Sequence, residues 1–282
     1  MRKNSVLLCL FALMLLFSAC NLQNTEPQQT FPPYSGEAYC IINENQPDFT
    51  EDEMTILAYE WYSPLDRLGR CGVARACLGE ELMPTEQRES ISHIKPSGWV
   101  QASYDFVDGG VLYNRCHLIG FQLAGENANE RNLITGTRFL NVEGMLPFEN
   151  MVADYIKETG NHVLYRVTPE YTDDCLVAEG VRIEAKSVED DGAGICFHIY
   201  AYNHQPGVLI DYKTGQSMQS YRDEIATIAV ETYYILNINS KKFHSADCKQ
   251  GQGVKSENRE NFYGSREDAL LFGYIPAGCC NP

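Results

Sequence analysis

One stretch near the middle of the chain limits the possible folds more than any other part of the sequence. Residues 99–106 alternate between apolar and polar side chains, and an Asp-Gly-Gly turn at 108–110 precedes residues 111–113. This pattern predicts a β-hairpin that ends at His117. Pro147 then stands at a position typical of a first helical residue, and apolar residues recur every three to four positions after it. The stretch therefore predicts two antiparallel strands followed by an amphipathic helix.

The end of this expected hairpin carries residues suited to one kind of chemistry. Asn114, Arg115 and His117 stand close together, and Asn141 and Glu149 follow further along the chain. A histidine that is neutral near pH 7 can take a proton from water, and an arginine offers a planar set of donors to phosphate oxygens. Amide and carboxylate oxygens are ligands that Mg²⁺ accepts. Hydrolysis of a phosphodiester needs all of these parts, so the set predicts that reaction.

The residues around the histidine resemble those of a known family. Residues 113–120 resemble the Asp-Arg-Gly-His signature of the DNA/RNA non-specific endonucleases, which are ββα-metal (His-Me finger) enzymes. They are most similar to the secreted and DNA-entry nucleases of Gram-positive bacteria. Residues 132–138 and 140–145 look like the family's metal-ligand segment, and residues 148–150 stand where it has an accessory glutamate. The resemblance spans roughly residues 59–217 and implies an α+β fold, with a ββα-metal nuclease core and a central antiparallel sheet.

The resemblance implies a role for each residue that matches the family's site. His117 would be the general base, and Arg115 would stabilise the transition state. Asn141 would be the single direct protein ligand of a Mg²⁺ or Mn²⁺ ion, and Glu149 would orient water at that ion. Asn132 matches a further asparagine of the site. The implied activity is metal-dependent cleavage of DNA with little sequence specificity, with RNA left open as a second substrate.

Two positions depart from the family's pattern. Asn114 stands where the family has an aspartate, so an amide replaces a carboxylate, and Cys116 replaces the glycine of the motif. Both changes bear on the rate and on the affinity for metal more than on the type of reaction. Asn114 is still expected among the catalytic residues, and Arg88 and Arg138 are the arginines expected to contact the substrate.

Two other functions stay open. Without the motif aspartate at Asn114, the chain could be a surface lipoprotein that binds DNA and does not cut it. Alternatively, Cys116 could be the nucleophile of a cysteine hydrolase. Its position beside His117 is weak support, because a nucleophile and its base are normally brought together by the fold and not by adjacency in sequence.

The N-terminal residues predict export. Residues 1–19 combine a basic start with a short apolar core, and small residues precede Cys20, whose thiol would carry the lipid of a bacterial lipoprotein. Phe17 occupies a position that leucine normally takes in such signals, so secretion without an anchor also stays open. Residues 20–50 are rich in Gln, Asn, Pro and Glu, which predicts a flexible tether. The tether would join the cell membrane to an extracellular nuclease domain at residues 51–220.

The chain is acidic, with a formal net charge of −16. Such a field repels a polyanion, so long-range attraction of nucleic acid is not expected. Residues 111–141 form a slightly positive island, whereas acids cluster at residues 44–60 and 184–191. Binding of nucleic acid is therefore expected to be local, weak and sensitive to salt.

Two further patterns concern the body of the domain. Residues 162–168, 176–186 and 195–202 alternate as antiparallel strands do and are expected to form the main sheet. Cys71 and Cys77 are close enough in sequence to form a loop disulfide, which export of the chain would permit.

Residues 233–282 resemble the small Ada-type zinc-binding modules that are appended to some secreted nucleases. The expected Zn²⁺ ligands are His244, Cys248, Cys279 and Cys280. Ala277 stands where such modules have the first cysteine of their second pair, and adjacent cysteines are poor joint ligands of one tetrahedral ion. Three interpretations stay open: a zinc site, a structural role without metal, and a disulfide between Cys248 and Cys280.

Overall fold

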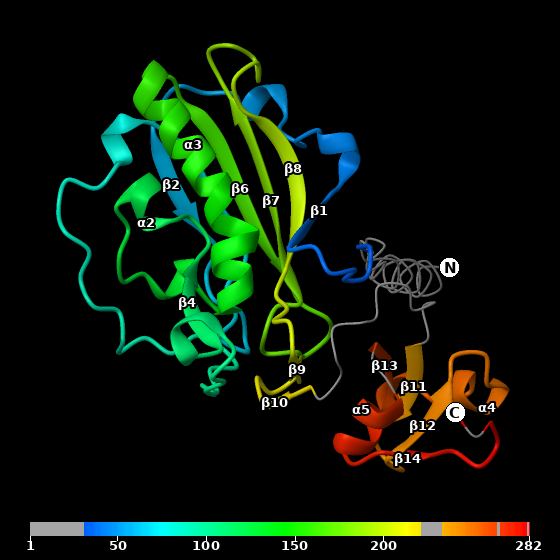
Figure 1. Ribbon diagram of the computed structural model, residues 1–282. Helices are drawn as coiled ribbons and strands as arrows, with labels where there is room; N and C mark the ends of the chain where they lie inside the picture. Colours follow the sequence, from blue (N-terminus) through cyan, green and yellow to red (C-terminus); the bar gives the residue numbers. More distant parts are fainter. Residues whose placement is uncertain (1–30, 221–232, 264–265, 281) are drawn as a thin grey trace, which may run out of the picture. The chain divides into compact units, whose positions relative to one another are not determined.

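The computed structural model describes residues 31–220, 233–263, 266–280 and 282 of the chain (Figure 1). The predicted signal at residues 1–19 and Cys20, the predicted site of lipid attachment, lie outside these residues. None of the described helices is long and apolar enough to cross a membrane.

A six-stranded antiparallel sheet forms the centre of the larger domain, with the strand order β1-β8-β7-β6-β3-β2. Its strands are β1 (Tyr39–Ile41), β2 (Tyr59–Tyr62), β3 (Ala74–Leu78), β6 (Val163–Glu170), β7 (Gly180–Ser187) and β8 (Cys196–Tyr202). Side chains alternate between its two faces, and those on one face, such as Ala74, Tyr165 and Ile183, are fully buried. The three alternating segments expected to form the main sheet are confirmed as β6, β7 and β8.

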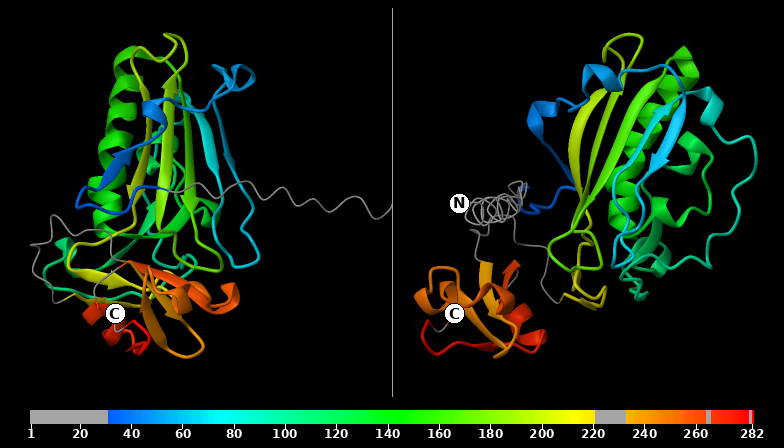
Figure 2. Two further views of the ribbon diagram at one scale, coloured as in Figure 1. Left: turned by 90° about the vertical axis from the view of Figure 1, so that its right-hand side faces the viewer. Right: turned by 180° about the vertical axis from the view of Figure 1, so that it is seen from behind.

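Helix α3 (Leu146–Thr159) covers the buried face of this sheet, as Figures 1 and 2 show. Pro147 fits in its first turn because the backbone there needs no hydrogen-bond donor, and Gly160 ends the helix in a left-handed conformation with a φ of 70°. The amphipathic helix expected from the sequence is therefore confirmed. Its buried residues, which join the apolar cluster of the sheet, are Phe148, Val152, Ala153 and Ile156.

The hairpin that carries the candidate residues differs from the expected one. Strand β4 (Tyr113–His117) pairs with β5 (Leu133–Thr137), and residues 99–106 form only an isolated antiparallel bridge, between Ser103 and Val111. The predicted turn is therefore confirmed, but the predicted partner of β4 is wrong. Gln101 explains the difference. Its side-chain amide accepts from the Tyr113 N–H at 2.9 Å and donates to the Tyr113 carbonyl at 2.7 Å. A neighbouring strand would otherwise make these bonds.

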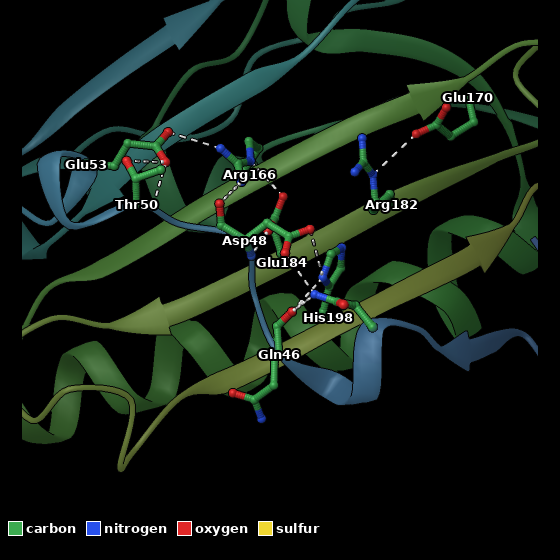
Figure 3. A network of polar contacts seen from close by, with 10 residues as sticks. Gln46, Asp48, Thr50, Glu53, Arg166, Glu170, Arg182, Glu184 and His198 are labelled. Carbon is green, nitrogen blue, oxygen red and sulfur yellow. Dashed lines mark hydrogen bonds and ion pairs between the residues drawn. The ribbon is translucent and has the colours of Figure 1, made fainter. Parts of the chain in front are cut away.

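Residues 34–50 are packed against the domain, so the predicted flexible tether at residues 20–50 is wrong for this part. Strand β1 extends the sheet by pairing with β8. The N–H of Asp48 donates to the Glu184 carboxylate at 2.7 Å, and the Asp48 carbonyl accepts from Arg166 at 3.1 Å. Figure 3 shows this network. Bonds to charged side chains far along the chain therefore fix a segment whose composition is typical of a linker.

All nine cysteines among the described residues are free thiols. Cys71 Sγ donates to the Leu133 carbonyl at 3.2 Å, whereas Cys77 Sγ donates to the Thr55 carbonyl at 3.0 Å. The predicted disulfide between Cys71 and Cys77 is therefore wrong, because strand β3 begins between them and each thiol contacts a different part of the domain.

The C-terminal residues form a small sheet with its own apolar cluster. The strands are β11 (Tyr233–Asn237), β12 (Lys242–Ser245), β13 (Arg259–Tyr263) and β14 (Ile275–Pro276), in the order β13-β11-β12-β14. The helices are α4 (Lys249–Gln252) and α5 (Arg266–Leu271). Earlier in the chain, β9 (Val208–Ile210) and β10 (Ser217–Gln219) pair as a short hairpin. The buried residues of the C-terminal cluster are Leu236, Phe243, Ala269 and Tyr274.

Gly136 on β5 lies against the fully buried side chain of Cys116, which makes a test of the packing behind the hairpin possible. A Cβ atom at position 136 would lie 2.4 Å from Cys116 Sγ. We expect Gly136→Ala to lower the free energy of unfolding by about 1–3 kcal/mol, because overpacking forces neighbouring atoms to shift. Urea denaturation followed by circular dichroism measures this change.

The control for this prediction is the same substitution in a Cys116→Ala background. Removal of the thiol should reduce the cost of Gly136→Ala, because contacting residues are not additive. An unfolding midpoint for Gly136→Ala equal to that of the parent chain would contradict the packing.

Candidate active site

A pocket of about 560 Å³ lies beside β4, the short helix α2 (Phe121–Ala124) and the start of α3. It brings together residues from distant parts of the chain that the sequence singled out for their chemistry. Those that line it are Arg88, Asn114, Arg115, His117, Arg138, Asn141 and Glu149.

His117 ends strand β4, and only 6% of its surface is exposed. Its Nε2 lies 2.9 Å from the Asn127 carbonyl oxygen, and its Nδ1 lies 3.3 Å from Nη2 of Arg88. A carbonyl oxygen only accepts hydrogen bonds, and a guanidinium group only donates them. Nε2 therefore carries the ring proton, and the lone pair of Nδ1 is directed toward Arg88.

The surroundings of His117 favour the neutral ring. Burial lowers the pKa of His117, the bond to the Asn127 carbonyl opposes this change, and the positive charge of Arg88 lowers the pKa further. The net shift is downward from the usual histidine value, so the ring is unprotonated at neutral pH. A neutral imidazole in a pocket can accept a proton.

Glu149 lies in the first turn of α3 and reaches the same pocket. Burial raises the pKa of Glu149 to about 7, although a hydrogen bond with Gln122 and the charge of Arg88 act in the opposite direction. Gly120 leaves room for this carboxyl group, because a Cβ atom there would lie 2.5 Å from Glu149 Oε2. A carboxylate removed from water with so little compensation is suited to bind a cation.

Two amides complete the polar lining of the pocket. Asn141 lies in a π-helical turn (Leu140–Met145) that leads directly into α3, and such turns often occur at functional sites. Asn114 Nδ2 is buried and has no hydrogen-bond partner among the described residues. One pocket thus receives an amide oxygen, a carboxylate and an unsatisfied amide donor. This set fits a hard cation bound next to a phosphate.

Arg115 has partners that the sequence did not predict. Its Nε donates to the Ile94 carbonyl, and its Nη2 donates to the Ser92 carbonyl at 2.7 Å. Its guanidinium group also lies over the Trp99 ring, 4.2 Å from the ring centroid. Arg115 therefore fixes a loop at the rim of the pocket, whereas the guanidinium group of Arg88 contacts His117 inside it.

Asn132 and Arg138 both have structural partners. Asn132 is fully buried, where its amide donates to the Ile119 carbonyl at 3.0 Å and accepts from the Ile119 N–H at 2.9 Å. It is not among the described residues that line the pocket, and its two bonds hold the backbone of Ile119 in place behind β4. Arg138 lines the pocket and pairs with Asp108 at 2.8 Å.

Cys116 is turned away from the pocket. It is fully buried against Gly136, and burial raises the pKa of its thiol far above the usual cysteine value. Since the thiolate is the nucleophilic form of cysteine, this thiol is inert. The alternative of a cysteine hydrolase that uses Cys116 is therefore wrong.

The C-terminal residues hold a second group of candidate ligands. His244, Cys248, Cys279 and Cys280 each place one ligand atom within 4.8 Å of the others. Cys279 Sγ lies 3.5 Å from Cys248 Sγ, and Cys280 Sγ lies 3.9 Å from His244 Nδ1. A hydrogen bond from the Gly251 N–H, followed by contacts with the neighbouring ligands, lowers the pKa of Cys248 to about 6. Cys248 and Cys280 are free thiols, so the disulfide between them is wrong, and both adjacent cysteines reach the group.

Some contacts of the pocket could not be found from the sequence. The group that orients His117 is the backbone carbonyl of Asn127, which any residue type could supply. Gln122 acts on Glu149 from a helix of only four residues, which carries no periodic signal. Gly120 does leave a signal in the sequence, because a glycine next to the motif can mark a close approach of another group. Its φ of −59° shows that the backbone itself does not require glycine there.

Comparisons with known proteins show which proteins this chain resembles. Residues 51–189 match the family model described as DNA/RNA non-specific endonuclease. Among solved structures, the chain is similar to NucA from Streptococcus agalactiae with a magnesium ion bound, with 26% identity, a TM-score of 0.57, and coverage of 64% of this chain and 87% of that one. It is also similar to the Sda1 nuclease with a bound zinc ion, with 26% identity, a TM-score of 0.56, and coverage of 65% and 97%. Comparison with curated protein sequences gave no match.

The contact between Arg88 and His117 predicts the titration of the ring. Arg88→Met removes both a donor to Nδ1 and a positive charge, and each of these favours the neutral imidazole. The pKa of His117 should therefore rise in this variant, and the protonated form should persist to higher pH. NMR titration of the imidazole signals measures the change.

Arg67→Met is the matched control, since Arg67 is exposed and pairs with Asp174 away from the pocket. The pKa of His117 should not change in the control. A pKa that stays the same or falls in Arg88→Met would show that the contact is not formed in solution.

Proposed function

We propose, given that this chain belongs to the DNA/RNA non-specific endonuclease family of phosphodiester-hydrolysing enzymes, that its pocket cuts DNA internally with His117 as the general base. The observation that carries the proposal is the arrangement of the ring. It is neutral, its proton is held on Nε2 by the Asn127 carbonyl, and its Nδ1 lone pair is beside a cation. The same chemistry would apply to RNA.

The proton transfer follows from the two ring nitrogens. A water molecule attacks the phosphorus atom while His117 Nδ1 takes one of its protons, and the bond from phosphorus to the leaving 3′-oxygen breaks. The departing 3′-oxygen takes a proton from a second water molecule, and His117 later returns its proton to solvent. The product ends carry a 5′-phosphate and a 3′-hydroxyl. The imidazolium that forms is stabilised because Nε2 already donates to the Asn127 carbonyl.

Arg88 must leave Nδ1 before the base can act. A scissile phosphate in the pocket offers oxygens that bind a guanidinium group more strongly than a neutral imidazole does. Arg88 would therefore move to the phosphate and release the lone pair of His117. Arg115, which stays bonded to the Ser92 carbonyl, would hold the rim of the pocket during this change.

Asn141 and Glu149 are the residues that would hold a Mg²⁺ or Mn²⁺ ion. The bound ion would neutralise negative charge on the phosphate and on the leaving oxygen. The π-helical turn directs Asn141 to the same pocket as the Glu149 carboxylate, which supports this assignment. The similar NucA structure contains magnesium, which supports the choice of ion.

Asn114 would act through its amide N–H group. Its Nδ2 is buried without a partner in the described part of the chain, which is costly unless the substrate supplies an acceptor. A phosphate oxygen is such an acceptor. Asn114 would thus bind the substrate and would not be a weakened form of the family's aspartate.

The substitution His117→Ala tests the base. We expect cleavage of plasmid DNA to fall by about 10²–10⁴-fold, which is the usual contribution of a general base, with DNA affinity little changed. Asn141→Ala should also reduce turnover and raise the Mg²⁺ concentration that is required, and by more than Glu149→Gln. Lys157→Ala, on the exposed side of α3, is the control and should behave as the parent.

Near-parental turnover in His117→Ala would end this assignment. A purified parent chain that binds DNA in the presence of Mg²⁺ or Mn²⁺ and never cuts it would support the alternative of a non-catalytic DNA-binding lipoprotein.

Export and membrane attachment are part of the proposal and rest on the sequence. Residues 1–19 would direct export, and Cys20 would carry the lipid that holds the enzyme at the outer side of the membrane. Radiolabelled palmitate should then be incorporated by the parent chain in a bacterial host, and Cys20→Ser should abolish the label.

We also propose a structural zinc ion in the C-terminal sheet, held by His244, Cys248, Cys279 and Cys280. Ligand atoms at zinc–sulfur distances of about 2.3 Å in a tetrahedron are about 3.8 Å apart. The spacings of 3.5 Å between Cys248 Sγ and Cys279 Sγ and 3.9 Å between Cys279 Sγ and Cys280 Sγ are close to this value. The low pKa of Cys248 also favours the thiolate that zinc requires.

Metal analysis of the purified chain tests the zinc proposal. We expect about one zinc per chain by mass spectrometry, and loss of that zinc in Cys248→Ser and Cys280→Ser, because each variant removes one of four ligands. Cys40→Ser, outside the group, is the control. The site would be refuted if the parent chain, purified under reducing conditions in the presence of zinc, contained no bound zinc.

A further inference from the structure

The face of the sheet opposite α3 holds a groove that the proposed reaction does not use. The groove has a volume of about 390 Å³ and lies across β2, β3, β6 and β7. Its side chains come from positions that alternate with the buried apolar residues under α3. The view from behind in Figure 2 shows this side of the sheet in front of the helix.

One row of paired residues crosses the groove. Trp61 is opposite Arg75, Arg75 is opposite Arg166, and Arg166 is opposite Glu184 on successive strands. Arg75 and Arg166 are thus like charges directly across an antiparallel pair, an arrangement that is destabilising in itself. Arg182 adds a third guanidinium group to the lining, in which Glu184 is the acid. Three arginines and one glutamate therefore line the groove, in a chain whose net charge is −16.

The carboxylate at the end of this row, Glu184, is bonded to other groups of the domain. Glu184 accepts from Arg166 Nε at 2.6 Å and from the Asp48 N–H at 2.7 Å. Arg166 also donates to Glu53 at 3.0 Å, and Figure 3 shows how these groups face one another. Arg182 pairs with Glu170 at 3.3 Å. These contacts partly neutralise the charges of Arg166 and Arg182, but none of them involves Arg75.

Arg75 lacks such partners. Among the described residues it forms no ion pair, and its Nε is buried without a hydrogen-bond partner. Its guanidinium group lies over the ring of Trp61, 4.4 Å from the centroid. Trp61 is 42% exposed, so part of its indole surface is open to a ligand. An unpaired cation next to an exposed indole suits a ligand that has both phosphates and aromatic rings.

We propose that this groove binds a single strand of nucleic acid, with Trp61 stacked on a base and Arg75 bonded to a phosphate. Proteins that hold single strands without reading sequence combine cationic side chains that contact the backbone with aromatic side chains that stack on bases. This proposal rests on the proposed function, since the ligand is a strand of the same polymer that the pocket cuts. The groove and the pocket share no lining residue, so the groove would retain long substrate and take no part in the chemistry.

Binding to a labelled 30-nucleotide DNA strand tests the groove, measured by fluorescence anisotropy in a His117→Ala background. We expect Trp61→Ala and Arg75→Gln each to weaken binding by about fivefold or more, because stacking and phosphate contacts of this kind are lost. Arg75→Gln should also reduce the salt dependence of binding by about 0.7 in the log–log slope, as expected for one phosphate contact. Lys157→Gln on α3 removes an exposed positive charge from the other side of the sheet and should bind as the background does.

Hydrolysis of bis(p-nitrophenyl) phosphate by chains with an intact His117 separates this proposal from the proposed function. That ester is too small to reach from the pocket to the groove, so Trp61→Ala and Arg75→Gln should hydrolyse it at the parental rate. Equal affinity of both variants for the 30-nucleotide strand, within twofold of the background, would overturn the groove proposal. An equal loss on the small ester would do so as well. A parent chain that hydrolyses neither this ester nor plasmid DNA would refute the proposed function. The anisotropy measurement would still show whether the groove binds the strand.

Trp61→Phe and Arg75→Lys guard against loss of folding. Each keeps most of the side-chain volume, and circular dichroism melting confirms the fold. Trp61→Phe should retain more affinity than Trp61→Ala, because phenylalanine still stacks on a base.

Discussion

The proposed chemistry of this protein depends on the hydrogen bond between His117 Nε2 and the carbonyl of Asn127. That bond determines which nitrogen carries the proton, and so it determines which nitrogen can act as a base. The hydrogen bond can form only while the end of β4 stays in place. Asn132 provides this constraint, because its buried amide makes two bonds to the backbone of Ile119, two residues beyond the histidine. Asn132 does not line the pocket, but by holding this backbone in place it helps to keep the Nδ1 lone pair of His117 directed into the pocket.

The opposite side of the pocket depends on how α3 begins. The π-helical turn before the helix points Asn141 toward the pocket, and the first helical turn contributes Glu149. The apolar side of the same helix is buried on the sheet, so these two polar groups have little freedom to move apart. Burial that stabilises the domain also strips water from the carboxyl group and raises its pKa to about 7. A cation bound in the pocket would offset the free-energy cost of removing this carboxylate from water.

The sequence predicted those parts of the fold that follow from local periodicity. The helix after Pro147 and the strands β6 to β8 have strong apolar patterns, and the residues of the motif do meet in one pocket. The predictions were wrong where a side chain forms the hydrogen bonds to a backbone segment that a neighbouring strand would otherwise form. Gln101 bonds to both backbone groups of Tyr113, so the alternating residues before the turn do not form a strand. Arg115 is likewise bonded to main-chain carbonyls, a role that its residue type cannot reveal.

The segment at residues 34–50 has a consequence for where the domain physically begins. The match to the family starts at residue 51, but the sheet does not end there. A chain cut at residue 51 would expose the edge of β8, and free strand edges invite pairing with other molecules. It would also remove Asp48 and leave a Glu184 that is 1% exposed with one donor fewer. A truncation chosen from sequence similarity would therefore produce a protein prone to aggregate, and its low yield could be mistaken for a lack of activity.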